Sequence, residues 1–263
     1  MEIKDELTLV IFTHEGYYKM LPTVLEGVKN IQDNIVKRYI VSPTKIDVPG
    51  YTHLSDSGLW RVLDPNFRHR ILYQKKWYRQ QILKLCIDLV KGIEGNILIL
   101  DGDVVITQPM KFIENNKINY YMAGEYNKAY FTCNEKLIGL NKVRPDSFIS
   151  EAMVFRPEVL DSLKHYIQDY NKSKDWLSVI EEVAYESITK RTFTDVCLSE
   201  FELYGSYATE WYSDTINKYI PPYQHKNYQP RMTVTGWQDM LPEELYNSIR
   251  ERCPHVLQSV LFV

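Results

Sequence analysis

Three short runs of aliphatic residues alternate with amphipathic segments early in the chain, and this alternation constrains the fold more than any other feature. The runs are LTLVIF at 7–12, RYIVS at 38–42 and NILIL at 96–100. Between them, residues 20–31 and 80–91 carry apolar side chains at the spacing of a helix face. Apolar strands that are joined through helices are typical of a parallel sheet covered on both faces. The sequence therefore predicts an α/β fold.

The second half of the chain is expected to be less regular. SEAMVF at 150–155 is a candidate strand, and helices are expected over about 158–171 and directly after Asp175. The tail from Pro221 onward contains several prolines and is expected to be a loop that wraps back over the body. No repeat, low-complexity segment or linker divides the 263 residues, so we expect a single domain.

Composition excludes several classes of protein. A net charge of −3 gives no general attraction to nucleic acid or anionic membrane. No apolar stretch approaches the roughly 18–20 residues of a membrane span, and the N-terminal segment lacks the pattern of a signal peptide. The cysteines are widely spaced, without a zinc-binding pattern, so we expect reduced thiols and a cytoplasmic location. They are Cys86, Cys133, Cys197 and Cys253.

Two aspartates follow the third aliphatic run, as Asp101-Gly102-Asp103. In open parallel sheets, ligands bind outside the carboxyl ends of the strands. Thr13-His14 and Ser42-Pro43 follow the other two runs, so all three groups are expected at one shared edge. Two carboxylates this close repel each other unless a cation lies near them. The plain alternative is an acidic turn in which Gly102 supplies an unusual backbone conformation.

A second alternative for the acidic pair is phosphoryl chemistry. DGDVV matches the DxDx(T/V) nucleophile motif of haloacid-dehalogenase-type phosphatases, in which the first aspartate attacks phosphorus. That motif usually follows the first strand, whereas Asp101 follows the third. The downstream acidic pair that completes the Mg²⁺ site of those enzymes is also absent from the sequence.

The stretch ILILDGDVV resembles the DxD motif of GT-A-fold glycosyltransferases. The blocks KWYRQQILKL (76–85), ISEAMVFRPEVL (149–160) and LSEFELYGSY (198–207) are similar to segments of a poorly characterised bacterial and phage family of GT-A-like proteins. The resemblance covers most of the chain. It implies a Rossmann-type, mostly parallel central sheet with helices on both faces. It also implies a nucleotide-sugar-binding half over about 1–110, and an acceptor half with a C-terminal tail over about 111–263.

The resemblance implies a metal-dependent transfer of sugar from a nucleoside-diphosphate-sugar to an acceptor hydroxyl. Asp101 and Asp103 would bind Mn²⁺ or Mg²⁺, whose other ligands are phosphate oxygens. The ion neutralises the diphosphate leaving group. The expected donor-binding residues are Thr13 and His14 at the first strand end, Arg79, Gln80 and Lys84 on the preceding helix, and Asp101 itself. The alternatives are a helix cap for Thr13-His14 and a solvated helix face for Arg79 and Lys84.

Glu151 and Glu200 are the candidates for acceptor contact and general base. Ser199 and Glu202 have the spacing of a capping box, which predicts a helix beginning at Glu200 with Glu202 in a structural role. A helix N-terminus would hold Glu200 ionised, as a base requires. His225 is the candidate for a C-terminal metal ligand.

His255 competes with His225 for that position, and either histidine is equally consistent with an ordinary surface residue. The chain contains 20 tyrosines, several of them in the segment that includes Tyr204. Such residues suit either half-buried packing or an amphipathic lining for a ligand, and on the second interpretation Tyr204 binds substrate.

Residues 60–91 hold eight Lys or Arg against two Asp or Glu, with aromatic residues interleaved. Such a segment suits the diphosphate of a nucleotide-sugar or, as the alternative, a nucleic acid backbone. The acceptor is therefore left open between a saccharide and DNA carrying a hydroxymethylated base. A protein that binds sugar or nucleic acid without catalysis is a further alternative.

Overall fold

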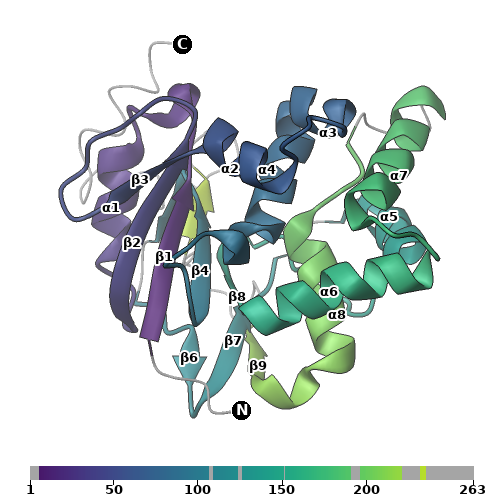
Figure 1. Cartoon of the computed structure of the whole chain (residues 1–263). Helices are drawn as coiled ribbons and strands as arrows, with labels where there is room; N and C mark the ends of the chain where they lie inside the picture. The colour runs from purple at the N-terminus through teal and green to yellow at the C-terminus, as the bar shows by residue number, and fades with distance from the viewer. Residues whose placement is uncertain are drawn as a thin grey trace.

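The computed structural model describes residues 6–106, 109–123, 126–150, 152–190, 196–220 and 232–234. A five-stranded sheet lies at its centre, in the order β3-β2-β1-β4-β8 (Figure 1). Its strands are β1 (Glu6–Phe12), β2 (Asn34–Ser42), β3 (Thr52–Ser55), β4 (Asn96–Asp101) and β8 (Ala152–Phe155). The first four are parallel and β8 is antiparallel to β4. The predicted α/β class with a mostly parallel sheet is confirmed.

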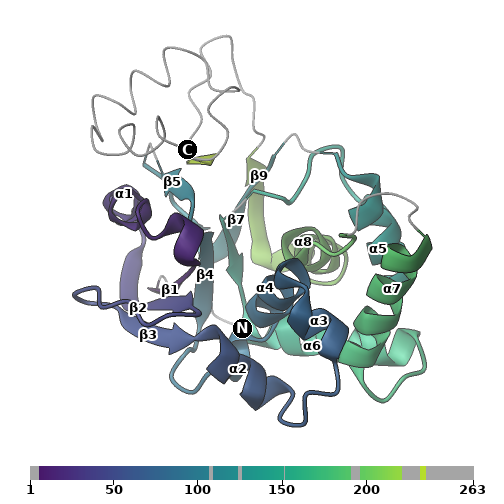
Figure 2. The same cartoon turned by 90° about the horizontal axis from the view of Figure 1, so that it is seen from above.

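Helices cover both faces of this sheet (Figure 2). The chain passes from β1 to β2 through α1 and returns from β3 to β4 through α4. Because both crossovers are right-handed and run in opposite directions, the two helices lie on opposite faces. The helices are α1 (Leu21–Val28), α2 (Asp56–Leu63), α3 (Arg70–Gln74), α4 (Lys76–Leu85), α5 (Lys128–Ile138), α6 (Pro157–Tyr170), α7 (Trp176–Lys190) and α8 (Glu200–Trp211). None of the described helices is long and apolar enough to cross a membrane.

Smaller sheets extend the central one. The strand β7 (Lys117–Tyr121) pairs with β6 (Ile113–Glu114) and with β9 (Ile216–Ile220). The strand β5 (Val104–Ile106) pairs with β10 (Met232–Val234). The tail was expected to wrap back as a loop; its described part forms β10, and the remainder from 221 onward lies outside the described residues.

Two boundaries differ from the sequence prediction. The helix expected over 80–91 begins earlier, as α4, and its last part is a separate turn, η2 (Ile87–Leu89). The chain between β2 and residue 58 contains β3 and the start of α2, neither of which the sequence predicted. The sequence THLS of β3 has no apolar run and its residues are half-buried or exposed, so the pattern of a buried strand is missing.

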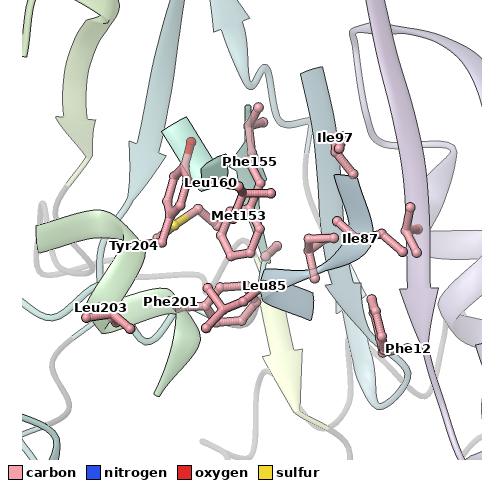
Figure 3. Packing of buried hydrophobic residues seen from close by; sticks show 14 of the residues in the cluster. Phe12, Leu85, Ile87, Ile97, Met153, Phe155, Leu160, Phe201, Leu203 and Tyr204 are labelled. Carbon is pink, nitrogen blue, oxygen red and sulfur yellow. The ribbon is translucent and has the colours of Figure 1, made fainter. Parts of the chain in front are cut away.

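Figure 3 shows the part of the core that lies between the sheet and the helices α4, α6 and α8. Phe155 of β8 packs edge-on against Phe201, with 5.9 Å between ring centroids, and lies 4.2 Å from the ring of Tyr204. Tyr204, a predicted substrate-binding residue, is 1% exposed, and its hydroxyl accepts the amide hydrogen of Arg156 at 2.9 Å. The structure therefore places Tyr204 in the core, where it anchors the end of β8.

The parallel strands end together, as expected. Phe12 at the end of β1 is in register with Asp101 of β4 on one side and with Val41 of β2 on the other. The backbone amide of Thr13 donates to the carbonyl of Val41 at 2.9 Å. The residues that follow β1, β2 and β4 consequently lie along one carboxyl-end edge, which is the usual ligand position of such a sheet.

Candidate functional site

Gly102 is required by a close approach between β4 and β1. Its amide donates to the carbonyl of Phe12 at 2.7 Å. A Cβ at this position would lie 2.5 Å from both Cβ and Oγ1 of Thr13, and 2.8 Å from the Phe12 carbonyl oxygen. Its φ lies outside the left-handed region. Gly102 is therefore required for close packing at the strand end. It does not supply the unusual backbone angle that the acidic-turn interpretation needs.

We expect Gly102→Ala to destabilise the protein by about 1–3 kcal/mol, the range for inserting a methyl group into a filled space. Gly58→Ala in α2 is the matched control, because its Cβ would meet only Ser55, at an ordinary 3.4 Å. Urea unfolding of both variants measures the difference. Equal stability of the two variants would contradict the assigned packing role.

Lys84 supplies the cation beside Asp101. The side chain is 1% exposed, and its Nζ lies 2.6 Å from Oδ1 of Asp101 and 2.5 Å from Oε1 of Glu200. Burial alone would lower the pKa of Lys84, but the carboxylates of Asp101 and Glu200 outweigh burial and raise it. The ammonium is therefore charged. Gln80, one helical turn earlier, donates to the same Asp101 oxygen at 3.2 Å.

One ammonium does not balance this site. When Asp101, Asp103 and Glu200 are all ionised, three negative charges face the single positive charge of Lys84, which leaves an excess of two. The pKa of Asp103 is raised, first by burial and next by the charge of Asp101. A hydrogen bond with Tyr17 lowers this pKa in part. The strand edge is therefore a place where a further cation is favoured.

Glu200 does not have the environment predicted for a general base. It does begin α8, and Ser199 Oγ accepts the Glu202 amide at 3.3 Å, so the predicted helix start is confirmed. However, burial raises the pKa of Glu200, although Lys84 partly opposes this effect. The helix N-terminus was expected to favour the ionised form of Glu200, but desolvation has the larger effect on its pKa. The buried Glu200 carboxylate lies behind Lys84, in position to hold that side chain.

Glu202 has a structural role, as expected, and its side chain also reaches beyond α8. Its carboxylate accepts the Phe148 amide at 2.8 Å and the Ser147 hydroxyl at 3.1 Å. It thus fixes the loop that precedes β8, from a position on the first turn of α8.

Thr13 and His14 both lie at the edge but differ in environment. Thr13 is buried, and within the described part of the chain its Oγ1 has no hydrogen-bond partner. His14 is exposed and caps the turn η1 (Glu15–Tyr17), where Nδ1 accepts the Gly16 amide at 3.1 Å. Partial burial and then the charge of Lys76 lower the pKa of His14. The alternative of a cap is thus supported for His14, while Thr13 offers an unused polar atom at the strand end.

Arg79 faces a different part of the edge from Lys84. Its guanidinium lies 3.2 Å from Asp56 and 5.2 Å from the ring centroid of Tyr73. Asp56 directly follows β3, so it belongs to the same carboxyl-end edge. Sequence reasoning missed Asp56 because it missed β3; the signal that was available is the Ser55 cap, whose Oγ accepts the Gly58 amide at 3.3 Å.

Three predicted site residues cannot be placed relative to the edge. Glu151, His225 and His255 lie outside the described residues. Within the described ranges, no three His, Cys, Asp or Glu side chains are grouped so that they could hold a metal ion. Asp101 and Asp103 give the strand edge two neighbouring carboxylates, which is fewer than such a group contains.

These features define an α/β protein with an acidic, lysine-bridged strand edge. A family model described as "Family of unknown function (DUF6492)" matches residues 26–235. The chain therefore belongs to this family. Comparison with curated proteins gives no match.

Among solved structures, the chain is similar to mouse xyloside xylosyltransferase 1 in its apo form. The identity is 12%, with 90% of this chain and 100% of that chain covered and a TM-score of 0.45. It is similar to an active-site mutant of LgtC at 9% identity, with 97% of each chain covered and a TM-score of 0.44. It is also similar to the glycosyltransferase GlyE of Streptococcus pneumoniae TIGR4 at 12% identity and a TM-score of 0.32, covering 96% of this chain and 51% of that one. All three TM-scores lie below 0.5, so these similarities assign no function to the chain.

Proposed function

We propose that the protein is a metal-dependent glycosyltransferase that moves a sugar from a nucleoside-diphosphate-sugar to an acceptor hydroxyl. The observation that carries the proposal is the charge at the carboxyl-end edge. Asp101 and Asp103 stand there, with Glu200 behind them, and when all three are ionised they carry two negative charges more than Lys84 balances. Burial and then the charge of Asp101 raise the pKa of Asp103. A divalent cation that is also bound by a diphosphate relieves this repulsion and positions the donor.

The residues of the chain have separate roles in this proposal. Asp101 and Asp103 would hold Mn²⁺ or Mg²⁺, which neutralises the charge that develops on the diphosphate leaving group. Lys84 and Gln80 fix the orientation of the Asp101 carboxylate from α4. Glu200 fixes Lys84 in turn. Thr13 would contribute its unpaired hydroxyl to the nucleotide. Glu151 is kept as the acceptor-side base, because Glu200 is committed to Lys84.

A saccharide acceptor is favoured over DNA. Several of the cations in the basic segment 60–91 already have carboxylate partners. Lys84 pairs with Asp101, Arg79 with Asp56, and Arg68 lies 3.8 Å from Asp175. Cations neutralised within the protein contribute little to binding a phosphate backbone. On this proposal, the nucleotide-sugar half covers about 1–110 and the acceptor half about 111–263.

A thermal-shift screen of nucleoside diphosphates and nucleotide-sugars, with and without Mn²⁺, tests the proposal. We expect one nucleotide to raise Tm only when metal is present, since binding to the folded state alone stabilises it by mass action. The nucleotide-sugar that raises Tm should then be hydrolysed slowly, or its sugar transferred slowly, by the protein. A phosphoaspartate on Asp101 without any nucleotide-sugar binding would instead favour the phosphohydrolase alternative. Metal-independent sugar binding without turnover would favour the non-catalytic alternative.

A further inference from the structure

Two buried cysteines from distant parts of the sequence meet beside α4. Cys133 lies on α5, and Cys197 lies in the segment 196–199 that leads into α8. Both are buried free thiols, close enough for each to shift the pKa of the other. The apolar sequence context of Cys197 is typical of a small buried hydrophobic residue. Its contacts in the structure are those of a polar sulfur.

Tyr78 of α4 makes two contacts with Cys197. The Cys197 amide donates to the Tyr78 hydroxyl at 3.1 Å, and that hydroxyl lies 3.4 Å from the Cys197 Sγ. The bond between the tyrosine hydroxyl and the sulfur lowers the pKa of Cys197. Ser187 of α7 makes a further side-chain hydrogen bond with Cys197. Side chains from three helices therefore converge on one sulfur atom.

These hydrogen bonds have an electrostatic consequence. The bond with Cys133 lowers the pKa of Cys197 most; burial opposes it, and the bonds with Tyr78 and Ser187 add to the lowering, to about 7. Cys133 shows the opposite effect, since its pKa is raised by the same bond and by burial. Cys197 therefore ionises more readily than an ordinary cysteine, while the Cys133 thiol beside it is held in the neutral form.

We propose that Cys133 and Cys197 form an oxidation site that closes to a disulfide when the protein meets a peroxide. The Cys197 thiolate attacks one peroxide oxygen, the O–O bond breaks, and a sulfenic acid forms as water leaves after protonation. The Cys133 sulfur then attacks the Cys197 sulfur, the S–O bond breaks, and a second water is released. In total, two thiols are oxidised, one peroxide is reduced and one S–S bond forms.

The site is connected to the acidic edge through α4. Trp77 donates its indole hydrogen to the Leu198 carbonyl at 2.7 Å, and the Glu200 amide donates to Gln81 at 3.2 Å. The segment that carries Cys197 therefore also positions Glu200, which holds Lys84. A disulfide to α5 would constrain this segment three residues before Glu200.

Peptide mapping of the full-length protein tests the proposal without reference to its enzymatic activity. After treatment with hydrogen peroxide and alkylation of remaining thiols, we expect a Cys133–Cys197 cross-linked peptide that disappears on reduction with dithiothreitol. Before oxidation, alkylation of Cys197 should rise with pH around a midpoint of about 7. Cys86 should remain unlabelled over this range, because burial raises its pKa.

Two serine variants make the test specific. In Cys133→Ser, the cross-link is lost and Cys197 is trapped by a sulfenic-acid reagent such as dimedone. In Cys86→Ser, the matched control, the cross-link forms as in the wild type. The proposal is overturned if wild-type protein gives no Cys133–Cys197 peptide at peroxide levels that oxidise its methionines. It is also overturned if Cys197 pairs with Cys86 or Cys253 instead.

Discussion

Asp101→Asn and Asp103→Asn are each expected to reduce metal-dependent turnover of the nucleotide-sugar by at least about 100-fold, because each removes an oxygen ligand that carries charge. The Mn²⁺-dependent rise in Tm with nucleotide should disappear in both variants. Asp169→Asn on α6 is the matched control, since it removes the same charge from an exposed position. If either site variant binds metal and nucleotide as the wild type does, the metal-site assignment is wrong.

Measuring the stability of the variants without metal distinguishes the loss of a metal ligand from damage to the fold. A raised pKa means that folded Asp103 binds its proton more tightly than the unfolded chain does. The ionised group therefore opposes folding once the pH exceeds the ordinary value of 3.8. At pH 7 without metal, Asp103→Asn should consequently have a Tm at least equal to that of the wild type. Metal affinity of the wild type should fall on acidification as Asp103 takes up its proton.

Lys84→Met is expected to lower the free energy of unfolding by about 3–5 kcal/mol at pH 7, because it leaves buried carboxylates without their cation. Nucleotide binding should be lost as well, since Asp101 loses the group that orients it. Chemical denaturation and the thermal-shift screen measure the two effects. The loss of stability should be smaller at low pH, because the proton on Glu200, whose pKa is already raised, removes an unpaired charge.

Two further variants separate stability from function. Lys164→Met breaks a comparable ion pair, 2.6 Å from Asp88 and remote from the edge. It should cost similar stability while nucleotide binding is retained in the folded fraction. Lys84→Met combined with Glu200→Gln should recover part of the stability but none of the binding. A Lys84→Met protein as stable as the wild type would contradict the assigned ion pairs.

The sequence predicted those parts of the fold that have a local pattern. The strands β1 and β4 were found because their apolar runs are buried on both faces, and the start of α8 was found from the spacing of Ser199 and Glu202. The shared edge followed from the parallel order of the strands. The strand β3 was missed because its four residues carry no apolar alternation.

The chemistry of the edge was predicted only in part. The acidic pair was predicted to attract a cation. Lys84, which supplies a cation to Asp101, was instead predicted to bind the donor substrate. Lys84 and Glu200 are 116 positions apart, and no local spacing indicates that they form a buried pair. The roles of Gln80 and Glu200 likewise depend on which face α4 turns toward the sheet, and that is decided by packing in three dimensions.

The helix α4 contacts both halves of the chain. Lys84 and Gln80 hold the end of β4, whereas Trp77, Tyr78 and Gln81 hold the segment that enters α8. Separating these two parts of the chain therefore requires breaking the ion pair between Lys84 and Glu200. Occupancy of the strand edge and the order of the entrance to α8 are consequently thermodynamically linked. The free energy by which an ordered entrance to α8 favours ligand binding at the edge equals the free energy by which ligand binding favours that order.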